Sequence, residues 1–289
     1  MQSFLGKSYS SYGEIIQGIL PDEGHFLVSL PINAWSKVKI KKSKINNLSV
    51  VDCPNIKTKL LCELLLEKNI LNYGYHLSVS IDSQIPVGKG LSSSTADLNA
   101  AINAFSNAFD LDFSNKEKSS YMMKVEPHDP VHYKSCVLYR QKEGKLVTNY
   151  KYIPNFWIVS IDAGGVIDTV GEHNKNSFFS YEDINNYSSL LDDLSNAFKL
   201  KDDVKIASIA TESLFLSTRY KSEKILKKYV LIAQRYHAMG IQHTHSGKCT
   251  GLLFSGELAN EEIIHIQEDI FKSYGFCSKI YKTMKFNYD

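Results

Sequence analysis

The segment PVGKGLSSSTAD, residues Pro86–Asp97, follows an alternating apolar stretch and opens a helix-like stretch that runs through Phe109. Gly88 and Gly90 permit a positive backbone φ and a close approach to a ligand. The start of the following helix offers N–H groups without intrahelical partners and a partial positive charge, both of which suit phosphate. Small hydroxyls in the first turn add hydrogen bonds or reach a Mg²⁺ ion. The segment therefore predicts a phosphate-binding turn, although a serine-capped helix after an ordinary tight turn has the same pattern.

Two common nucleotide-binding motifs are excluded by the spacing of this segment. A Walker A loop requires G-x-x-x-x-G-K-[ST], and here Lys89 precedes Gly90 instead of following it. The segment is not G-x-G-x-x-G either. A phosphate site built from backbone geometry needs no excess of basic residues elsewhere in the chain.

The composition is that of an ordinary soluble globular protein. The chain has 289 residues, of which 43% are apolar and 22% charged, enough for one large or two modest domains. Its 33 basic and 31 acidic residues give a net charge of +2, so we expect neither nucleic acid nor an anionic membrane as a partner. No window approaches the roughly 20 apolar residues of a membrane helix.

Cysteine usage and the N-terminal residues favour a cytoplasmic protein. The first 20 residues lack a basic region followed by an apolar core, so they predict no signal peptide. The cysteines are scattered, odd in number and without a C-x-x-C pair, which favours reduced thiols. They are Cys53, Cys62, Cys136, Cys249 and Cys277.

Hydrophobic periodicity and the order of the elements predict an α+β or mixed α/β protein in two halves. Residues 1–152 are strand-rich and residues 153–289 are helix-rich, so we expect a domain boundary between them. The predicted strands are 26–32, 36–42, 75–81, 156–161, 251–254 and 276–281, with a hairpin over 135–150. The predicted helices are 58–70, the stretch through Phe109, 114–125 with Ser114 and Glu117 as a capping box, most of 181–235, and 261–271.

The pattern Pro-x-Gly-x-Gly-Leu-x-Ser-Ser in the Pro86–Asp97 segment resembles the phosphate-binding signature of the GHMP kinases, a family of small-molecule kinases. Two further segments match the family in the right order. They are SYGEIIQG at Ser11–Gly18 and HTHSGKCTG at His243–Gly251. Within the family the chain is most similar to the L-threonine kinases of cobalamin side-chain synthesis (the PduX type).

Short matches to these threonine kinases run along nearly the whole chain. They are S-x-G-E-x-x-Q-G at 11–18, L-V-S-x-P at 27–31, I-P-V-x-K-G-x-x-S-S-T-A-D at 85–97, E-P-x-D at 126–129 and H-S-G at 245–247. The stretch DAGGVIDT at 162–169 also resembles relatives of this group. The chain departs from the pattern at Tyr12, where those kinases usually have Cys, and at Ser92, where they often have Ala.

The resemblance implies a two-domain fold, with an N-terminal domain like domain 2 of ribosomal protein S5 and a ferredoxin-like C-terminal domain. It implies ATP and Mg²⁺ as cofactors and transfer of the γ-phosphoryl group to the side-chain hydroxyl of free L-threonine. It places ATP against the phosphate-binding turn and Mg²⁺ at Ser94 and Glu126. The implied ATP-binding residues are Pro86, Gly88, Lys89, Gly90, Leu91, Ser92, Ser93, Ser94 and Thr95.

Glu126 and Asp129 are two neighbouring acids, of which one can bind a metal ion while the other accepts a proton. Pro127 ends the preceding helix, which leaves Glu126 at the helix end. The resemblance makes Asp129 the general base that accepts the hydroxyl proton, although an aspartate beside Pro130 also suits a local turn. Lys89 either adds charge to the phosphate site or is merely solvated.

The substrate side of the site rests on weaker signals. Glu14 and Gln17 are candidates for binding an amino acid, because a carboxylate is a suitable partner for an ammonium group; they are equally consistent with polar residues at a strand end. Asp168 is a further substrate-side candidate. The resemblance implies that His245, Ser246 and Gly247 close the site from the second domain.

Other functions stay open at this point. The alcohol is threonine or another small hydroxyl compound, such as serine, homoserine or a specialised metabolite, and the pathway is cobalamin synthesis or another route. A non-catalytic nucleotide- or metabolite-sensing module on the same fold is the alternative from a different class. His243 with His245 lacks a third ligand at a spacing typical of zinc, and Pro127 and Pro130 break any helix that would align His128 with His132, so neither pair predicts a zinc site. No pattern in the sequence indicates an oligomeric state.

Overall fold

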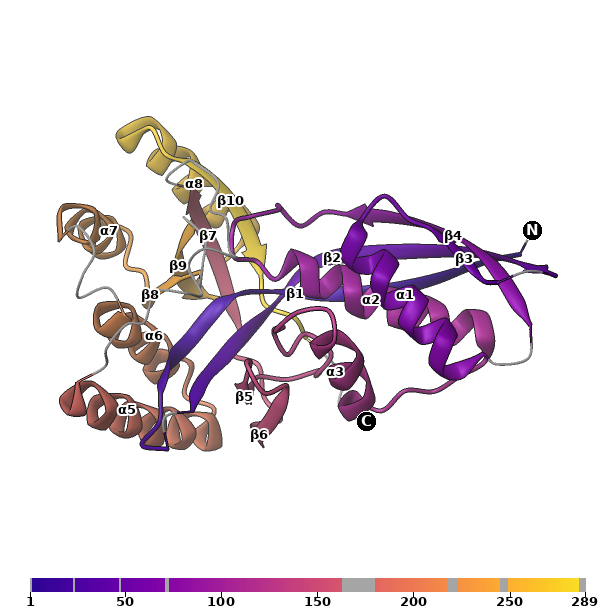
Figure 1. Ribbon diagram of the computed structural model, residues 1–289. Coiled ribbons are helices and arrows are strands. Elements are labelled where there is room, and N and C mark those ends of the chain that lie inside the picture. Colours follow the sequence, from indigo (N-terminus) through magenta and orange to yellow (C-terminus); the bar gives the residue numbers. More distant parts are fainter. Residues whose placement is uncertain are drawn as a thin grey trace.

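The computed structural model describes residues 2–22, 24–46, 48–70, 73–162, 180–217, 223–244 and 249–285. The described strands form two separate sheets, and helices pack against both (Figure 1). This mixture confirms the predicted α+β class. None of the helices in the described ranges combines the length and the apolar character needed to cross a membrane.

The first sheet is organised around one long strand, β2. Its order is β3-β4-β2-β5-β6, and β1 also pairs with β2 in antiparallel register from end to end. All pairings are antiparallel except β3 with β4. The strands are β1 (Gln2–Ile19), β2 (His25–Ile45), β3 (Val50–Asp52), β4 (Gly74–Ser83), β5 (Val137–Arg140) and β6 (Lys145–Asn149).

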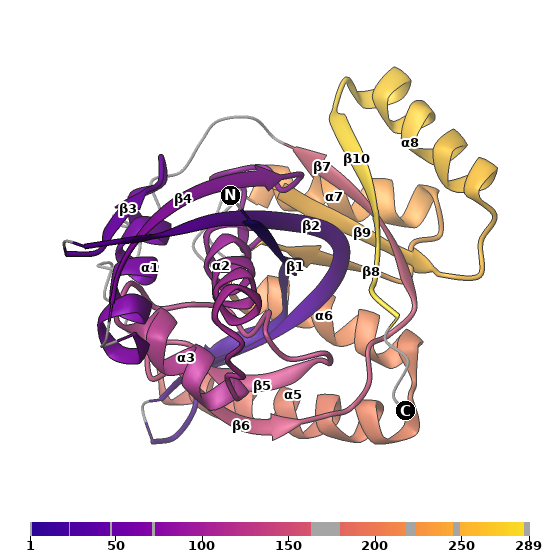
Figure 2. The same cartoon turned by 90° about the vertical axis from the view of Figure 1, so that its right-hand side faces the viewer.

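Two helices, α1 (Ile56–Asn69) and α2 (Ser93–Phe109), cover one face of this sheet (Figures 1 and 2). A buried cluster joins Val38 and Ile40 of β2 to Leu61 of α1 and Phe105 of α2. The shorter α3 (Asn115–Met123) begins at Ser114, which forms the predicted capping box with Glu117. The buried cluster therefore holds α1 and α2 against the same face of the sheet.

The second sheet is antiparallel, with the order β10-β7-β9-β8. Its strands are β7 (Phe156–Asp162), β8 (Gly240–His243), β9 (Cys249–Ser255) and β10 (Cys277–Lys282). The helices in this half are α5 (Tyr181–Leu200), α6 (Asp203–Ser217), α7 (Glu223–Arg235) and α8 (Asn260–Tyr274). The chain passes from the first sheet to the second between Asn149 and Phe156, close to the boundary predicted at 152/153. The division into two domains at this boundary stays a prediction.

The structure differs from the sequence-based elements mainly in the strands. The two strands expected at 26–32 and 36–42 are one continuous β2, and Pro31 lies opposite Ser11 beside a register shift that accommodates a residue without an N–H. Strands β1, β3 and β8 were not predicted. Much of β1 is rich in serine and glycine, so its sequence lacks the alternation of apolar and polar residues that signals a strand.

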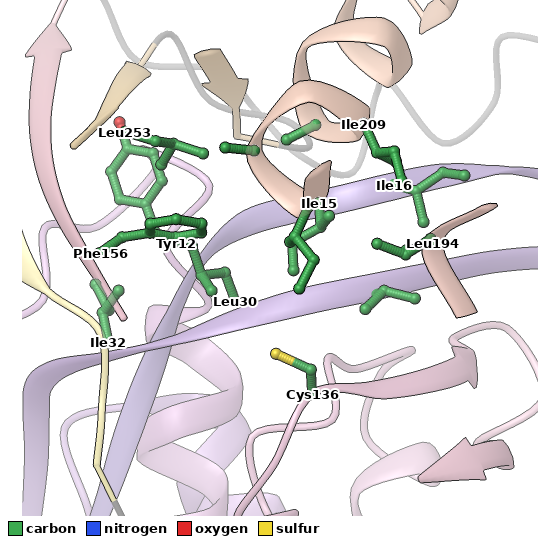
Figure 3. Packing of buried hydrophobic residues seen from close by; sticks show 14 of the residues in the cluster. Tyr12, Ile15, Ile16, Leu30, Ile32, Cys136, Phe156, Leu194, Ile209 and Leu253 are labelled. Atoms are coloured by element: carbon green, nitrogen blue, oxygen red, sulfur yellow. The ribbon is translucent and has the colours of Figure 1, made fainter. Parts of the chain in front are cut away.

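Tyr12 of β1 links the two sheets. Its side chain has no exposed surface, and its hydroxyl donates a 2.8 Å hydrogen bond to Ser160 of β7. Figure 3 shows the ring packed among Leu30, Phe156 and Leu253, which come from both halves of the chain. Tyr12, the position at which the chain departs from the family pattern, is therefore a core residue between the two sheets.

We predict that Tyr12 substitutions separate the hydrogen bond from the packing. Tyr12→Phe is expected to cost about 1 kcal/mol of unfolding free energy, because it removes one buried hydrogen bond. Tyr12→Ala is expected to cost about 3–5 kcal/mol, because it also leaves a cavity. Urea unfolding measures both, with Tyr181→Ala at an exposed position of α5 as the control. Equal losses for Tyr12→Ala and Tyr181→Ala would contradict the assignment.

Candidate active site

The predicted phosphate-binding turn connects β4 to α2. Gly88 and Gly90 both have φ of 71°, a conformation that favours glycine, so the turn uses its glycines as the sequence predicts. Ser92 is the N-cap of α2 with φ of 54°, and its side chain makes no capping hydrogen bond to the helix. The first-turn N–H groups of α2 are therefore left uncapped by that hydroxyl, as a phosphate site requires.

The hydroxyl of Ser92 instead binds Asp129. It donates a 2.6 Å hydrogen bond to Oδ2 of Asp129, and Nε2 of Gln141 donates to Oδ1 at 3.0 Å. The hydroxyls of Ser11 and Ser92 are also in hydrogen-bond contact. Asp129 is thus held beside the start of α2, with both carboxylate oxygens oriented by neighbouring side chains.

Glu126 lies in the segment after α3 that also carries Asp129, and it pairs with Ser94 of α2. Ser94 donates to Oε1 of Glu126, and Nζ of Lys57 lies 2.5 Å from Oε2. The Glu126 side chain is 20% exposed. The structure thereby brings together Ser94 and Glu126, the two residues that the resemblance assigned to the metal.

These two oxygen donors fit Mg²⁺. The ion prefers oxygen ligands, and in nucleotide sites it takes one or two protein groups together with phosphate oxygens and water. A hydroxyl in direct contact with a carboxylate, at the uncapped start of a helix, supplies that small protein contribution. Across the described ranges, no group of three or more His, Cys, Asp and Glu side chains gathers into a metal site.

Lys89 connects the phosphate-binding turn to the second sheet. Its ammonium lies 2.8 and 2.9 Å from the two carboxylate oxygens of Asp162, at the end of β7. The Lys89 side chain is only 16% exposed. Lys89 is therefore fixed by a cross-sheet ion pair, and the alternative of a merely solvated lysine is wrong.

The other residues assigned to ATP differ in how they contribute to the turn. Leu91 and Thr95 are buried, and the carbonyl oxygen of Leu91 accepts a 2.6 Å hydrogen bond from Ser10. Leu91 therefore anchors the turn in the core, whereas Pro86 and Ser93 are half-buried at the surface of the turn.

The two substrate-side candidates on β1 have different surroundings. Glu14 is buried in a bulged segment, three residues after Ser11. Gly13, with φ of 51°, presses this segment against β8, where an added Cβ would lie 2.5 Å from the carbonyl oxygen of His243. Gln17 pairs with Leu27 farther along β1, beyond the bulge.

The remaining substrate-side candidates lie outside the described residues. These are Asp168, His245, Ser246 and Gly247. Thr244, which directly precedes His245, is buried and continues from β8 beside the Gly13 bulge.

A buried histidine pair lies directly behind Asp129. His128 donates from Nδ1 to the carbonyl oxygen of Asp129 at 3.0 Å, and its Nε2 is 3.1 Å from the hydroxyl of Ser119. The His132 ring centroid is 5.4 Å from that of His128. Within the part of the chain that the structure describes, neither ring nitrogen of His132 has a hydrogen-bond partner.

Burial governs the protonation of both histidines. It lowers the pKa of His128, an effect that the nearby Asp129 partly opposes. Burial, together with the neighbouring His128 and Lys118, lowers the pKa of His132 to about 2. Both imidazoles are therefore neutral in the folded protein near neutral pH.

Several site residues have no role in the sequence-based assignment. They are Ser10, Ser11, Lys57, Gln141 and Asp162, which contact the turn or its two acids. Ser11 and Asp162 lie inside segments that resemble the family, so a signal existed for them. Lys57 and Gln141 carry no local pattern, because only the folded chain brings them to Glu126 and Asp129.

One family model matches part of the N-terminal half of the chain. Residues 57–133 match the family model described as the GHMP kinases N terminal domain. This match includes the phosphate-binding turn, Glu126 and Asp129, and it begins at Lys57.

Solved structures share the fold over nearly the whole chain. The Methanococcus jannaschii mevalonate kinase is 16% identical with a TM-score of 0.71, covering 98% of this chain and 99% of its own. A homoserine kinase from Cytophaga hutchinsonii is 15% identical with a TM-score of 0.69, covering 97% and 94%. A mevalonate pyrophosphate decarboxylase from Streptococcus pyogenes is 10% identical with a TM-score of 0.72, covering 99% and 98%. The predicted GHMP kinase fold is therefore confirmed.

We predict that His132 makes the fold sensitive to acid. In the unfolded chain a histidine binds a proton below about pH 6.5, whereas folded His132 stays neutral, so stability present above that pH is lost as the pH falls. Between pH 6.5 and 5 this loss is about 2 kcal/mol for one such group.

His132→Leu removes this contribution. Over this pH range, the unfolding free energy of the wild type is therefore expected to fall by about 2 kcal/mol more than that of the variant. Urea unfolding at pH 7.5 and pH 5 measures the difference. His265→Leu, at an exposed histidine of α8, controls for the loss of one imidazole. An unchanged pH dependence in His132→Leu would refute the prediction.

Proposed function

We propose that the protein is an ATP-dependent small-molecule kinase that phosphorylates the side-chain hydroxyl of free L-threonine, giving O-phospho-L-threonine and ADP. One observation carries the assignment as a kinase. Two serines of the same helix start, Ser92 and Ser94, each bind one acid, Asp129 and Glu126 respectively. The turn, the carboxylate proposed to bind metal and the carboxylate proposed to accept a proton are thus joined by direct contacts.

The turn and the start of α2 bind the triphosphate in this proposal. The uncapped N–H groups and the helix dipole favour negative charge. Lys89 adds a positive charge that Asp162 orients from β7. Phosphoryl transfer depends mainly on positioning and on stabilising charge, so these groups account for much of the expected catalysis.

Ser94 and Glu126 would hold Mg²⁺ in the complex. When bound, the ion neutralises charge that develops on the transferred phosphoryl group. Ser94 and Glu126 already lie side by side, so the two proposed protein ligands of the ion are adjacent before it binds.

Asp129 accepts the proton of the substrate hydroxyl. A hydroxyl is a weak nucleophile at neutral pH, and a positioned base contributes typically 10²–10⁴-fold. Ser92 and Gln141 orient the Asp129 carboxylate, and His128 binds its backbone carbonyl. The Asp129 carboxylate is therefore held in one orientation, as a general base that faces the substrate hydroxyl needs to be.

The choice of threonine over other alcohols rests on Glu14 and on the resemblance of the sequence. Glu14 is a buried carboxylate on the segment that carries Ser11, which contacts Ser92. A buried carboxylate suits the ammonium group of an amino acid. Gln17, Asp168 and residues 245–247 complete the proposed substrate side, and serine and homoserine are the rival amino acids.

We also propose that the protein works in the cytoplasm on a small-molecule substrate. All five cysteines are free thiols, three of them buried, which suits a reducing compartment. Phosphothreonine would then serve cobalamin side-chain synthesis or another route that consumes it.

We predict ATP consumption with threonine when the purified protein is tested across a panel of alcohols. The panel contains L-threonine, L-serine, L-homoserine, mevalonate and a sugar, with ADP release and phosphorus NMR of the product as readouts. Turnover with threonine above the others supports the proposal. Turnover only with an alcohol that lacks an amino group would refute the amino acid assignment, and nucleotide binding without turnover would favour a sensing module.

We predict that Asp129→Asn and Glu126→Gln each lower kcat by about 100-fold or more, because one removes the base and the other weakens metal binding. Extra Mg²⁺ is expected to restore part of the activity of Glu126→Gln and none of that of Asp129→Asn. Glu63→Gln, at an exposed glutamate of α1, is the control. Unchanged ATP consumption in both site variants would show that these roles are wrong.

A further inference from the structure

The ammonium group of Lys57 pairs with the carboxylate oxygen of Glu126 that Ser94 does not bind. Its Nζ lies 2.5 Å from Oε2, while Ser94 donates to Oε1, so both oxygens of the proposed metal carboxylate have partners. The Lys57 side chain is 40% exposed and the Glu126 side chain 20% exposed. A divalent cation that approaches this protein therefore meets a carboxylate already neutralised by an ammonium group.

The positive charge of Lys57 is unfavourable for the helix that carries it. Lys57 lies in the first turn of α1, which contains no acidic residue, and Asn55 caps the helix by accepting the N–H of Thr58 at 3.0 Å. The N-terminal end of a helix carries partial positive charge, so a lysine there is unfavourable by itself. The stability of α1 does not explain this lysine, whereas the charge of Glu126 does.

Two helix starts and one lysine therefore place positive charge around Glu126. The start of α2 reaches it through Ser94, and the start of α1 reaches it through Lys57. The two helices are packed together by a shared apolar cluster, which fixes this arrangement. Triphosphate bound at the α2 start would give the Lys57 ammonium a second anionic partner beside the one it already has.

We propose that Lys57 is a positioning residue that couples metal binding to nucleotide binding. In the nucleotide-free protein it holds Glu126 and competes with free divalent cations for that carboxylate. With nucleotide phosphates in the site, its ammonium moves to a phosphate oxygen and leaves Glu126 available. The inference rests on the proposed function, since it takes Glu126 as the metal carboxylate of a nucleotide site.

The coupling gives Lys57 two effects of opposite sign, and both are measurable without turnover. Lys57→Met is expected to bind Mn²⁺ about three- to tenfold more tightly in the absence of nucleotide, because a competing positive charge is gone. The same variant is expected to bind a non-hydrolysable ATP analogue with Mg²⁺ about tenfold more weakly, because a charged hydrogen bond to phosphate is lost.

The experiment uses the full chain, with Mn²⁺ binding followed by electron paramagnetic resonance and analogue binding by calorimetry. Lys57→Arg retains the charge and is expected to remain close to the wild type in both readouts. Lys59→Met removes a lysine from the same helix whose ammonium lies 4.0 Å from Glu63, and it is expected to change neither value. Circular dichroism checks that each variant is folded, and Lys57→Gln serves as a second neutral variant.

The possible outcomes separate this inference from the proposed function. If Mn²⁺ binds Lys57→Met and Lys57→Gln as weakly as the wild type or more weakly, Lys57 merely supports Glu126 and the inference is wrong. The proposed function stands in that case, provided that the wild type binds the analogue and turns over ATP. A wild type that binds no analogue overturns the proposed function, and the inference with it.

Discussion

The contact between the first turn of α2 and the segment that carries Glu126 and Asp129 is the interaction on which the site depends. Ser92 adopts a left-handed backbone conformation, so its hydroxyl reaches Asp129 instead of capping its own helix. Ser94, in the first turn of the helix, reaches Glu126. The left-handed backbone of Ser92 thus leaves the first N–H groups of α2 available for phosphate, while the two serines hold two acids beside them.

A short stretch of β1 holds this arrangement in place. The hydroxyls of Ser10 and Ser11 bind Leu91 and Ser92 of the phosphate-binding turn. The next residue, Tyr12, donates its hydroxyl to Ser160 of the second sheet, and Gly13 approaches the carbonyl of His243. Consecutive residues therefore connect the turn, β7 and β8, which explains why a serine-rich segment forms a buried strand.

Local signals in the sequence predicted the parts of the fold that they determine. The capping box at Ser114, the glycine turn at Gly88 and Gly90, and the apolar strand β7 follow from short-range patterns. The first part of β1, residues 2–11, was not predictable in this way, because its partners in β2 lie 20 to 40 residues away along the chain. The partner of Glu126 at Lys57 is 69 residues distant and has no local signature. Charge pairs of this kind become visible only when α1 and α2 are packed on the sheet.

A crystal structure of the protein with a non-hydrolysable ATP analogue and Mg²⁺ tests the central claim most directly. The account predicts that the phosphates lie against Gly88–Ser94, with the metal at Ser94 and Glu126 and with Asp129 facing the terminal phosphate. Phosphates bound anywhere else on the molecule, or a metal that does not contact Glu126, would contradict it.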